Sequence, residues 1–251
     1  MSDPAPAQTD QQRKIAEMAE LAGGLAHELR NPLSTIMINL KLLAEDLADD
    51  HAKAGDVRRR ARLKVEVLQR EAERLQSLFD EFLNLAGPCR LHEKLCDLNA
   101  LVDGLVGFFE PLAHSQGIGI QVVRHRDSLP CRVDENLLRQ ALLNLLINAQ
   151  QAMPDGGVLT ITVDGDDGAA RITVSDDGVG IAPEDRERIL RPFFSTKSRG
   201  NGLGLSITQR IIHEHGGTLS FESEVGRGTT FTVTLPLTPG DTDTSTSMAG
   251  R

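Results

Sequence analysis

The chain has 251 residues, of which 39% are hydrophobic and 25% are charged. These values are ordinary for globular proteins and exclude a wholly disordered or fibrous chain. The net charge of −9 argues against a protein that wraps nucleic acid, and no apolar run approaches the ~20 residues of a membrane-spanning helix.

The termini and the cysteines point to a cytoplasmic chain. The first 14 residues lack the apolar core of a secretory signal. Cys89, Cys96 and Cys131 are odd in number and have no metal-binding spacing, so we expect reduced thiols. Residues 1–12 and 238–251 are aperiodic and rich in small and polar residues, which predicts disorder at both ends.

Residues 13–90 have the pattern of a first, helical domain. Apolar or small residues recur at alternating steps of three and four, which is typical of a heptad seam. The members of this seam are Ile15, Met18, Ala22, Leu25, Leu29, Leu33, Ile36, Leu40, Leu43 and Leu47. Two successive steps of four, from Leu25 to Leu33, form a stutter that coincides with Pro32, so we expect a bend there.

A second seam follows a polar stretch, Asp49–Asp56, that predicts a turn. Its members are Ala61, Val65, Leu68, Ala72, Leu75, Phe79, Phe82 and Ala86. The two seams predict an antiparallel helical hairpin that ends at Gly87 and Pro88. Because two helices alone leave much of each seam in water, we expect two hairpins to pair as a homodimeric four-helix bundle.

Residues 97–237 predict a second domain in which helices and strands mix. Three segments have helical character, namely 98–115, 135–153 and 202–215. Six short segments have strand character, namely 117–123, 131–134, 159–164, 171–176, 218–224 and 229–236. This order favours an α+β layer in which helices cover one face of a single mixed sheet.

The first helix carries His27, Glu28 and Asn31 near the stutter. In the heptad register His27 faces away from the seam, and Asn31 lies one turn on along the same face. A surface histidine without a role is the simpler reading of this position alone. The sequence HELRN lacks the second histidine of a zinc protease motif, and we interpret His213-Glu214-His215 as a surface cluster at a helix end.

Polar residues also stand out in the second domain. Asn144 and Asn148 lie one turn apart on an apolar helix, either as surface amides or as oxygen ligands for Mg²⁺. Asp176 and Asp177 end a strand and are followed by Gly178 and Gly180, which fits either an ordinary turn or the floor of a nucleotide pocket.

Glycines at 200, 202 and 204 precede the last helix, where free N–H groups and the helix dipole favour a phosphate. The polar stretch 183–199 before them has no periodicity and is interpreted as a mobile lid. Each of these signals is weak by itself.

Together, the motifs resemble the catalytic core of two-component sensor histidine kinases, over residues 15–236. In order, the chain contains AHELRNPL, NLLINAQQAM, DDGVGI, RPFFSTK, GNGLGL and GRGTTF, which are similar to the H, N, first glycine, F, second glycine and third glycine boxes. The resemblance implies a dimerisation and histidine-phosphotransfer hairpin followed by an α+β sandwich of the GHKL (Bergerat) ATP-binding fold.

The resemblance also assigns roles to residues. It implies His27 as the phosphoacceptor, Glu28 as the acid that orients it, and Asn31 as an aid to phosphatase chemistry. It implies Asn148 as the Mg²⁺ ligand with Asn144 beside it, and Asp176 rather than Asp177 as the reader of adenine. The other positions implied to contact ATP are Gly178, Gly180, Lys197, Gly200, Gly202, Leu203, Gly204 and Thr229.

The chain departs from many family members after Asn148, where Gln151 and Ala152 replace a lysine and an aromatic residue. With NAQQAM and PFFSTK, this makes the chain most similar to the nitrogen-regulation class. The cation that meets the phosphates is then Lys197, Arg199 or Arg139. In GNGLGL, Asn201 takes the place of a more usual threonine.

The resemblance implies autophosphorylation of His27 from Mg-ATP and transfer to an aspartate of a response regulator receiver domain, with phosphatase activity as a further option. An upstream sensor domain or sensor protein would supply the input. The alternative is a dimeric ATP-binding switch or scaffold without histidine phosphorylation, which would bind nucleotide but form no acid-labile phosphoprotein.

Overall fold

The fold is known from a computed structural model, which describes residues 6–48, 54–87, 90–166, 168–197 and 200–237. Contacts between Cα atoms divide the chain into two units. The first unit contains Met1–Gly87 and Pro192–Leu203, and the second contains Pro88–Arg191 and Gly204–Arg251. Among the described residues, no helix is both long enough and apolar enough to cross a membrane.

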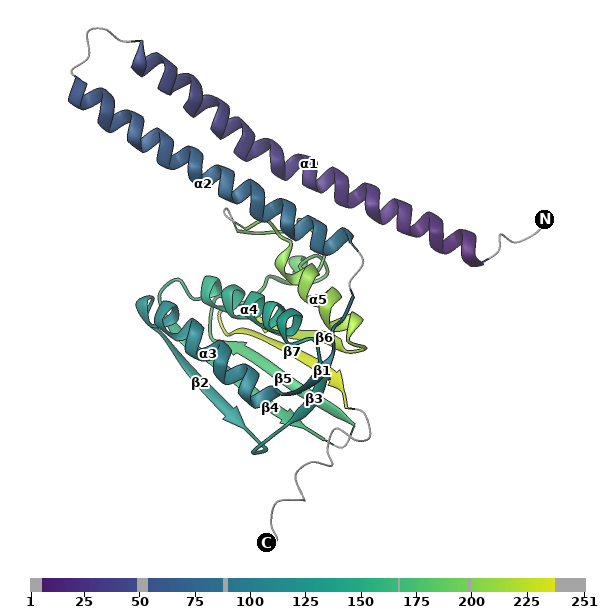
Figure 1. The fold of residues 1–251 in the computed structure, drawn as a ribbon. Coiled ribbons are helices and arrows are strands. Elements are labelled where there is room, and N and C mark those ends of the chain that lie inside the picture. The colour runs from purple at the N-terminus through teal and green to yellow at the C-terminus, as the bar shows by residue number, and fades with distance from the viewer. Residues whose placement is uncertain (1–5, 49–53, 88–89, 167, 198–199, 238–251) are drawn as a thin grey trace. The chain divides into compact units, whose positions relative to one another are not determined.

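The first unit is built on an antiparallel helical hairpin of α1 (Pro6–Leu47) and α2 (Ala54–Ala86), shown in purple and blue in Figure 1. Lys64 of α2 donates to the carbonyl oxygen of Leu42 and to the carboxylate of Asp46, which fixes the pairing near the closed end. This hydrogen bond from Lys64 is the main reason why the pKa of Asp46 is lowered.

The helix bounds differ from the sequence expectation at two places. Helix α1 begins at Pro6, inside the stretch whose composition predicts disorder, and it continues through Pro32 as one helix. The hydroxyl groups of Ser34 and Thr35 donate to the carbonyl oxygens of Arg30 and Asn31 around this proline. Helix α2 begins at Ala54, so Gly55 lies in its first turn, while residues 49–53 of the expected turn lie outside the described residues.

The predicted seams divide into two faces of the hairpin. Leu25, Leu29, Ile36 and Leu43 of α1, with Ala61, Leu68, Leu75 and Phe82 of α2, are half-buried. Other members of the seams are exposed, namely Met18, Leu33, Leu40, Leu47, Val65 and Phe79. Leu78, which the predicted seam omits, is buried in the hairpin and only 1% exposed.

The second unit contains a five-stranded mixed sheet in the order β2-β4-β5-β7-β6. Its strands are β2 (Ile118–Arg124), β4 (Gly157–Gly165), β5 (Ala169–Asp176), β6 (Thr218–Glu224) and β7 (Gly228–Pro236). The pair β2–β4 is parallel and the other neighbours are antiparallel.

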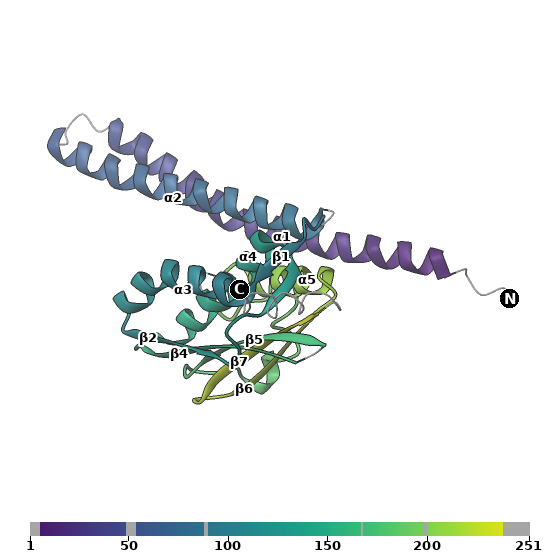
Figure 2. The same cartoon turned by 60° about the horizontal axis from the view of Figure 1, so that its bottom comes forward.

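Three helices cover one face of this sheet, as Figures 1 and 2 show. They are α3 (Leu98–Ser115), α4 (Glu135–Ala152) and α5 (Gly204–Glu214), while Pro183–Asp185 form a 3-10 turn, η1. Alternate residues of β4, β5 and β7 point into the core against the apolar faces of the helices, for example Ile161, Ile172 and Val233. The predicted order of a helical hairpin followed by an α+β sandwich is confirmed.

One strand assignment is wrong. Residues 131–134 were expected in the single mixed sheet, but β3 (Pro130–Val133) pairs instead with β1 (Lys94–Asp97) in a separate antiparallel ladder. The sequence KLCD of β1 is too short to show a period. This ladder places Cys96 directly opposite Cys131.

Candidate functional site

Asp176 ends strand β5 with a buried carboxylate, whose residue is only 6% exposed. Its Oδ1 atom accepts hydrogen bonds from the backbone N–H groups of Gly178, at 3.0 Å, and Thr229, at 3.3 Å. The neighbouring Asp177 is exposed, and its Oδ1 accepts from the backbone N–H of Val158 at 2.9 Å. The two acidic residues therefore have different surroundings, and Asp176 is the one held inside the fold.

Two glycines let the backbone come close to this carboxylate. Gly228, at φ +105°, lies so near strand β5 that a Cβ atom would be 1.9 Å from the carbonyl oxygen of Asp176. Gly180, at φ +70°, packs against the carbonyl oxygen of Glu224. Any side chain at either position would push the loop after β5 away from the turn before β7. Sequence reasoning quoted GRGTTF as a motif but did not single out Gly228.

Hydroxyl groups complete this region. Thr229 is buried, and its Oγ1 lies 3.0 Å from Oγ of Ser223 on strand β6. The same Ser223 hydroxyl donates to the carbonyl of Gly228 and accepts from the backbone N–H of Ile181. Ser223 therefore joins the two glycine-containing turns around Asp176, a role that sequence reasoning missed because a serine in a polar strand gives no signal.

The two asparagines of α4 are half-buried rather than exposed at the surface. The Nδ2 of Asn144 donates to the carbonyl oxygen of Gly204, at 3.1 Å, and approaches the hydroxyl of Thr208 at 3.5 Å. Thr208 is fully buried and donates in turn to Gly204 and Ala141. Asn144 thus ties α4 to the first turn of α5, whereas Asn148 stands one turn further along α4.

The glycine-rich segment has a bent backbone of its own. The backbone N–H of Phe193 donates to the carbonyl oxygen of Gly202, and Phe193 has a positive φ of 62°. Leu203 is buried, and its N–H donates to the side chain of Asn201. Gly200 lies three positions after Lys197, which is exposed. The backbone N–H of Lys197 donates to the hydroxyl of Ser195.

Of the three candidate cations for the phosphates, the structure describes two. Lys197 is exposed within the glycine-rich segment, and Arg199 lies outside the described residues. Arg139 forms a 2.8 Å ion pair with Glu135 in the first turns of α4, nine residues before Asn148. At 1.5 Å per residue this is about 14 Å along the helix, so Arg139 is the weaker candidate.

In the expected lid, residues 183–199, the side chain of Ile189 is buried and η1 forms a short turn.

On helix α1, His27 and Asn31 are exposed and Glu28 between them is half-buried. Pro32, which directly follows Asn31, is buried. Beside these residues an open, mainly apolar groove runs along the same helix; it is lined by Ala26, Leu29, Arg30, Leu33, Ser34, Met37 and Ile38. The helix thus presents an imidazole, an adjacent carboxylate and an amide beside an apolar surface.

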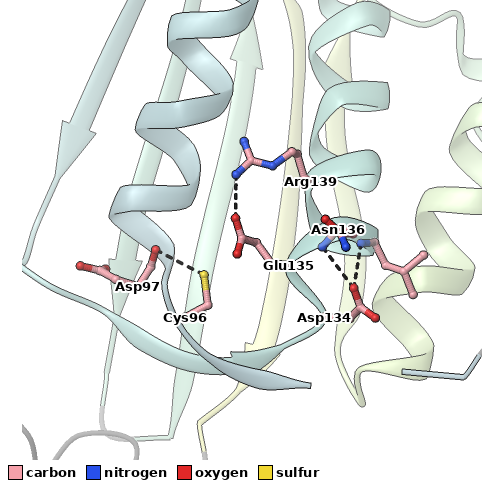
Figure 3. A network of polar contacts seen from close by, with 7 residues as sticks. Cys96, Asp97, Asp134, Glu135, Asn136 and Arg139 are labelled. Atoms are coloured by element: carbon pink, nitrogen blue, oxygen red, sulfur yellow. Dashed lines mark hydrogen bonds and ion pairs between the residues drawn. The ribbon is translucent and has the colours of Figure 1, made fainter. Parts of the chain in front are cut away.

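The start of α4 is fixed by a network of polar contacts (Figure 3). The carboxylate of Asp134 caps the helix by accepting from the backbone N–H groups of Asn136 and Leu137, and it also accepts from that of His92. Burial raises the pKa of Asp134, but these backbone donors outweigh it and hold the pKa below its usual value.

The interpretation of His215 as a surface residue is wrong, because it is buried. Its Nε2 accepts from the backbone N–H of Asp134 at 2.9 Å, so Nδ1 carries the proton and donates to the carbonyl oxygen of Ile211. This neutral imidazole joins the end of α5 to the start of α4. His213, two residues earlier, is exposed.

Two family models match the chain. Residues 17–87 match the His Kinase A (phospho-acceptor) domain, and residues 133–239 match the histidine kinase-, DNA gyrase B- and HSP90-like ATPases. Among curated proteins, the sensor histidine kinase ZraS of Escherichia coli (strain K12) is 37% identical over 225 residues, which cover 89% of this chain. The chain spans about half of that relative, 46% of its length.

Solved structures agree with these matches. The catalytic domain of histidine kinase ThkA is 32% identical and superimposes with a TM-score of 0.55, covering 59% of this chain and 97% of that domain. ThkA solved in complex with the response regulator protein TrrA gives a TM-score of 0.73 at 26% identity, over 95% of this chain and 69% of that one.

Proposed function

Since the chain belongs to the histidine kinase family, of which it is a catalytic core, we propose that it transfers the γ-phosphoryl group of ATP to its own His27 and then to an aspartate of a response regulator. One observation carries this proposal: an exposed His27 beside Glu28 occurs in the same chain as the buried, backbone-anchored Asp176. The ATP-binding match over residues 133–239 supports the use of ATP.

The buried Asp176 is suited to recognising adenine. Its Oδ1 is held in place by two backbone N–H groups, so its carboxylate has a fixed orientation before any ligand arrives. A carboxylate accepts only, which matches the exocyclic amino group of adenine, a donor. Gly178 and Gly180 bring backbone close to the base, and Thr229 stands opposite Asp176 in the β5–β7 ladder.

The protein oxygen atom available to Mg²⁺ fits the way in which this ion usually binds. Mg²⁺ keeps several waters and takes one or two protein oxygens together with phosphates, and the half-buried Asn148 offers one neutral amide oxygen. When bound, Mg²⁺ neutralises charge on the triphosphate. The side-chain NH2 group of Asn144 donates to the carbonyl oxygen of Gly204, so the part of Asn144 is to place the start of α5.

Phosphoryl transfer depends mostly on positioning and on charge stabilisation. The outer ring nitrogen of His27 attacks the γ-phosphorus; as the N–P bond forms, the bond to the bridging oxygen breaks and ADP leaves with the electron pair. Glu28 accepts the proton of the inner ring nitrogen in a hydrogen bond, which keeps the nucleophilic nitrogen unprotonated and stabilises the imidazolium that develops. Lys197 is our preferred cation for the phosphates.

We propose that the chain works as a homodimer. Leu33, Leu40 and Leu47 of α1, with Val65, Phe79 and Leu83 of α2, expose 41–66% of their surface on a hairpin that has heptad spacing. Burying this face against a second hairpin produces a four-helix bundle and removes the apolar side chains from water. The receiver domain, whose aspartate must reach phosphohistidine, then docks beside the exposed His27.

Further details follow from the same motifs. We propose that the chain is nearest the nitrogen-regulation class, which NAQQAM and PFFSTK support, and that it acts in the cytoplasm, which its sparse cysteines and use of ATP support. An upstream sensor domain or sensor protein provides the signal. Asn31, exposed one turn after His27, holds the water that hydrolyses the aspartyl phosphate of the regulator.

The test is incubation of the chain with γ-labelled ATP, first alone and then with candidate receiver domains. We expect a label that acid removes and alkali does not, and that passes to one receiver. His27→Gln should take up no label and should bind ATP with unchanged affinity. A chain that binds ATP but never takes up label would instead be the ATP-binding switch.

A further inference from the structure

Two cysteines face each other across the small ladder of the second unit. Strands β1 and β3 pair antiparallel, and the register sets Cys96 directly opposite Cys131. Side chains of directly opposed residues project from the same side of a ladder. The register therefore brings together two thiols that lie 35 positions apart in the chain.

The Cα spacing of such a pair lies within the range of disulfides, and the Cβ atoms, about 4.5–5.5 Å apart in opposed residues, must close to about 3.5–4.5 Å when the bond forms. The backbone N–H of Leu98 donates to the carbonyl oxygen of Leu129, two residues beyond the cysteines in the same register. Since hydrogen-bonded and non-hydrogen-bonded pairs alternate, Cys96 and Cys131 form a hydrogen-bonded pair, with Cα atoms about 5.5 Å apart. Disulfides span Cα distances of about 4.4–6.8 Å.

The two thiols differ in accessibility. Cys131 is only 1% exposed, and its Sγ lies 3.8 Å from the carbonyl oxygen of Pro236, whereas Cys96 is half-buried. The Sγ of Cys96 lies 3.7 Å from the carbonyl oxygen of Asp97, as Figure 3 shows. The Cys96 contact is a weak S–H hydrogen bond that a rotation of its side chain breaks.

We propose that Cys96 and Cys131 form an oxidative modification site, at which a peroxide converts the two facing thiols into one disulfide. The Cys96 thiolate attacks the O–O bond of the peroxide and becomes a sulfenic acid, releasing hydroxide. Cys131 then attacks the sulfenic sulfur and displaces water as the S–S bond forms. For hydrogen peroxide, two thiols lose two electrons and two protons, and one peroxide yields two waters.

The disulfide would link the two strands that lead into helices α3 and α4. Strand β1 leads directly into α3, where the side chain of Asp97 accepts from the backbone N–H of Asn99, and β3 leads through Asp134 into α4. The bond would close a loop that contains the whole of α3 and β2. The pair lies at the start of α4, about 20 Å along the helix from Asn148, so the nucleotide residues are not part of this site.

The surroundings of Cys96 set the pH at which it reacts. Burial raises the pKa of the Cys96 thiol, and the nearby carboxylates of Glu135 and Asp97 raise it further, while Arg139 acts in the opposite direction. Arg139 is also paired with Glu135. Because the thiolate is the reacting form, oxidation should be slow near neutral pH and faster as the pH rises.

The experiment oxidises the intact chain with hydrogen peroxide and maps its cysteines after trypsin without reduction. Cleavage at lysine and arginine separates the three cysteines into peptides 75–90 (Cys89), 95–124 (Cys96) and 127–132 (Cys131). We expect the 95–124 and 127–132 peptides to be joined, with the yield per unit time rising at least severalfold between pH 7 and pH 9. A reducing agent should separate them.

Variants and stability provide the controls. Cys89→Ser should still form the bond, whereas Cys96→Ser should not. The peptide map of the unaltered chain tests the bond directly. The result therefore does not depend on whether a Cys131→Ser variant folds. Oxidation should raise the thermal unfolding midpoint by roughly 5–10 °C and leave ATP affinity within about twofold. Overoxidation of Cys96 without a crosslink, or links only through Cys89, would overturn the proposal.

Discussion

Thr229 donates its backbone N–H to the carboxylate of Asp176 over 3.3 Å, and the same two residues are directly paired between strands β5 and β7. The strand pairing and the hydrogen bond to the Asp176 side chain therefore hold the same two residues together. Because Gly178 donates to the same oxygen, two backbone N–H groups orient the Asp176 carboxylate. A carboxylate held in this way needs little reorganisation when a donor arrives.

Asp176→Asn should weaken ATP binding by about 10–100-fold, because one hydrogen bond to a charged group contributes roughly 1.5–3 kcal/mol. The matched control is Asp177→Asn, since that exposed residue holds only the Val158 N–H. Titration with a fluorescent ATP analogue measures both. Equal losses in the two variants would contradict the choice of Asp176.

Asn148→Asp should lower autophosphorylation with Mg-ATP by about 100-fold or more, because a carboxylate changes both the charge and the hydrogen bonding beside the phosphates. The hairpin should keep its helicity. Asn136→Asp is the control, since Asn136 is an exposed amide in the first turn of the same helix. Wild-type labelling of His27 in Asn148→Asp would remove Asn148 from the metal site.

Asn31→Ala should reduce dephosphorylation of a phosphorylated regulator by about 10-fold or more while His27 is labelled normally. Asn31 lies one turn from His27 on the same exposed face, where its amide can hold a water in line with an aspartyl phosphate. Lys41→Ala, an exposed change further along α1, is the control. If both activities stay unchanged, Asn31 serves only the backbone before Pro32.

Leu40→Glu should shift the chain from dimer toward monomer in sedimentation velocity. The 46% exposed side chain of Leu40 lies on the face of α1 that we assign to the second copy, and a buried carboxylate there costs several kcal/mol. Lys41→Glu introduces the same acid at the neighbouring exposed position. Loss of the dimer in that control as well would indicate a general charge effect.

Asp134→Asn should destabilise the second unit by about 1–2 kcal/mol at pH 7, because an amide has one acceptor oxygen for the cap and turns an NH2 group toward the His92 N–H that Oδ2 accepts. The lowered pKa of Asp134 means that its contribution is complete above the unfolded pKa of about 3.9 and is lost as the pH falls through the folded value. Urea unfolding should therefore show a difference from wild type that narrows below about pH 4. Asp155→Asn, at an exposed turn, should show no such narrowing.

Sequence patterns predicted the regular elements well wherever they extended over several turns or alternations. Helix α3 and strand β6 have the predicted bounds, and the hairpin β4–β5 pairs as expected. Strand β1 was missed because four residues with one apolar pair carry no period. The place of β3 was wrong because a strand's partner depends on tertiary contacts, here with Lys94–Asp97, that local sequence does not encode.

The candidate site was predictable as a set of motifs but not as contacts. Asn144 and Asn148 look equivalent in sequence, yet Asn144 is bonded to Gly204, sixty residues away. His215 was interpreted as exposed because it lies at a polar helix end, but its contact with Asp134 buries it. Gly228 matters through its closeness to strand β5, which only the packed ladder reveals.

The strand order β2-β4-β5-β7-β6 has a consequence for solubility. Strand β6 is an open edge, and its exposed residues are polar: Thr218, Ser220, Glu222 and Glu224. Two copies that met along this edge would bring like charges together, and natural sheets use such charges to prevent edge-to-edge aggregation. The β6 edge of the sheet thus discourages growth into fibrils.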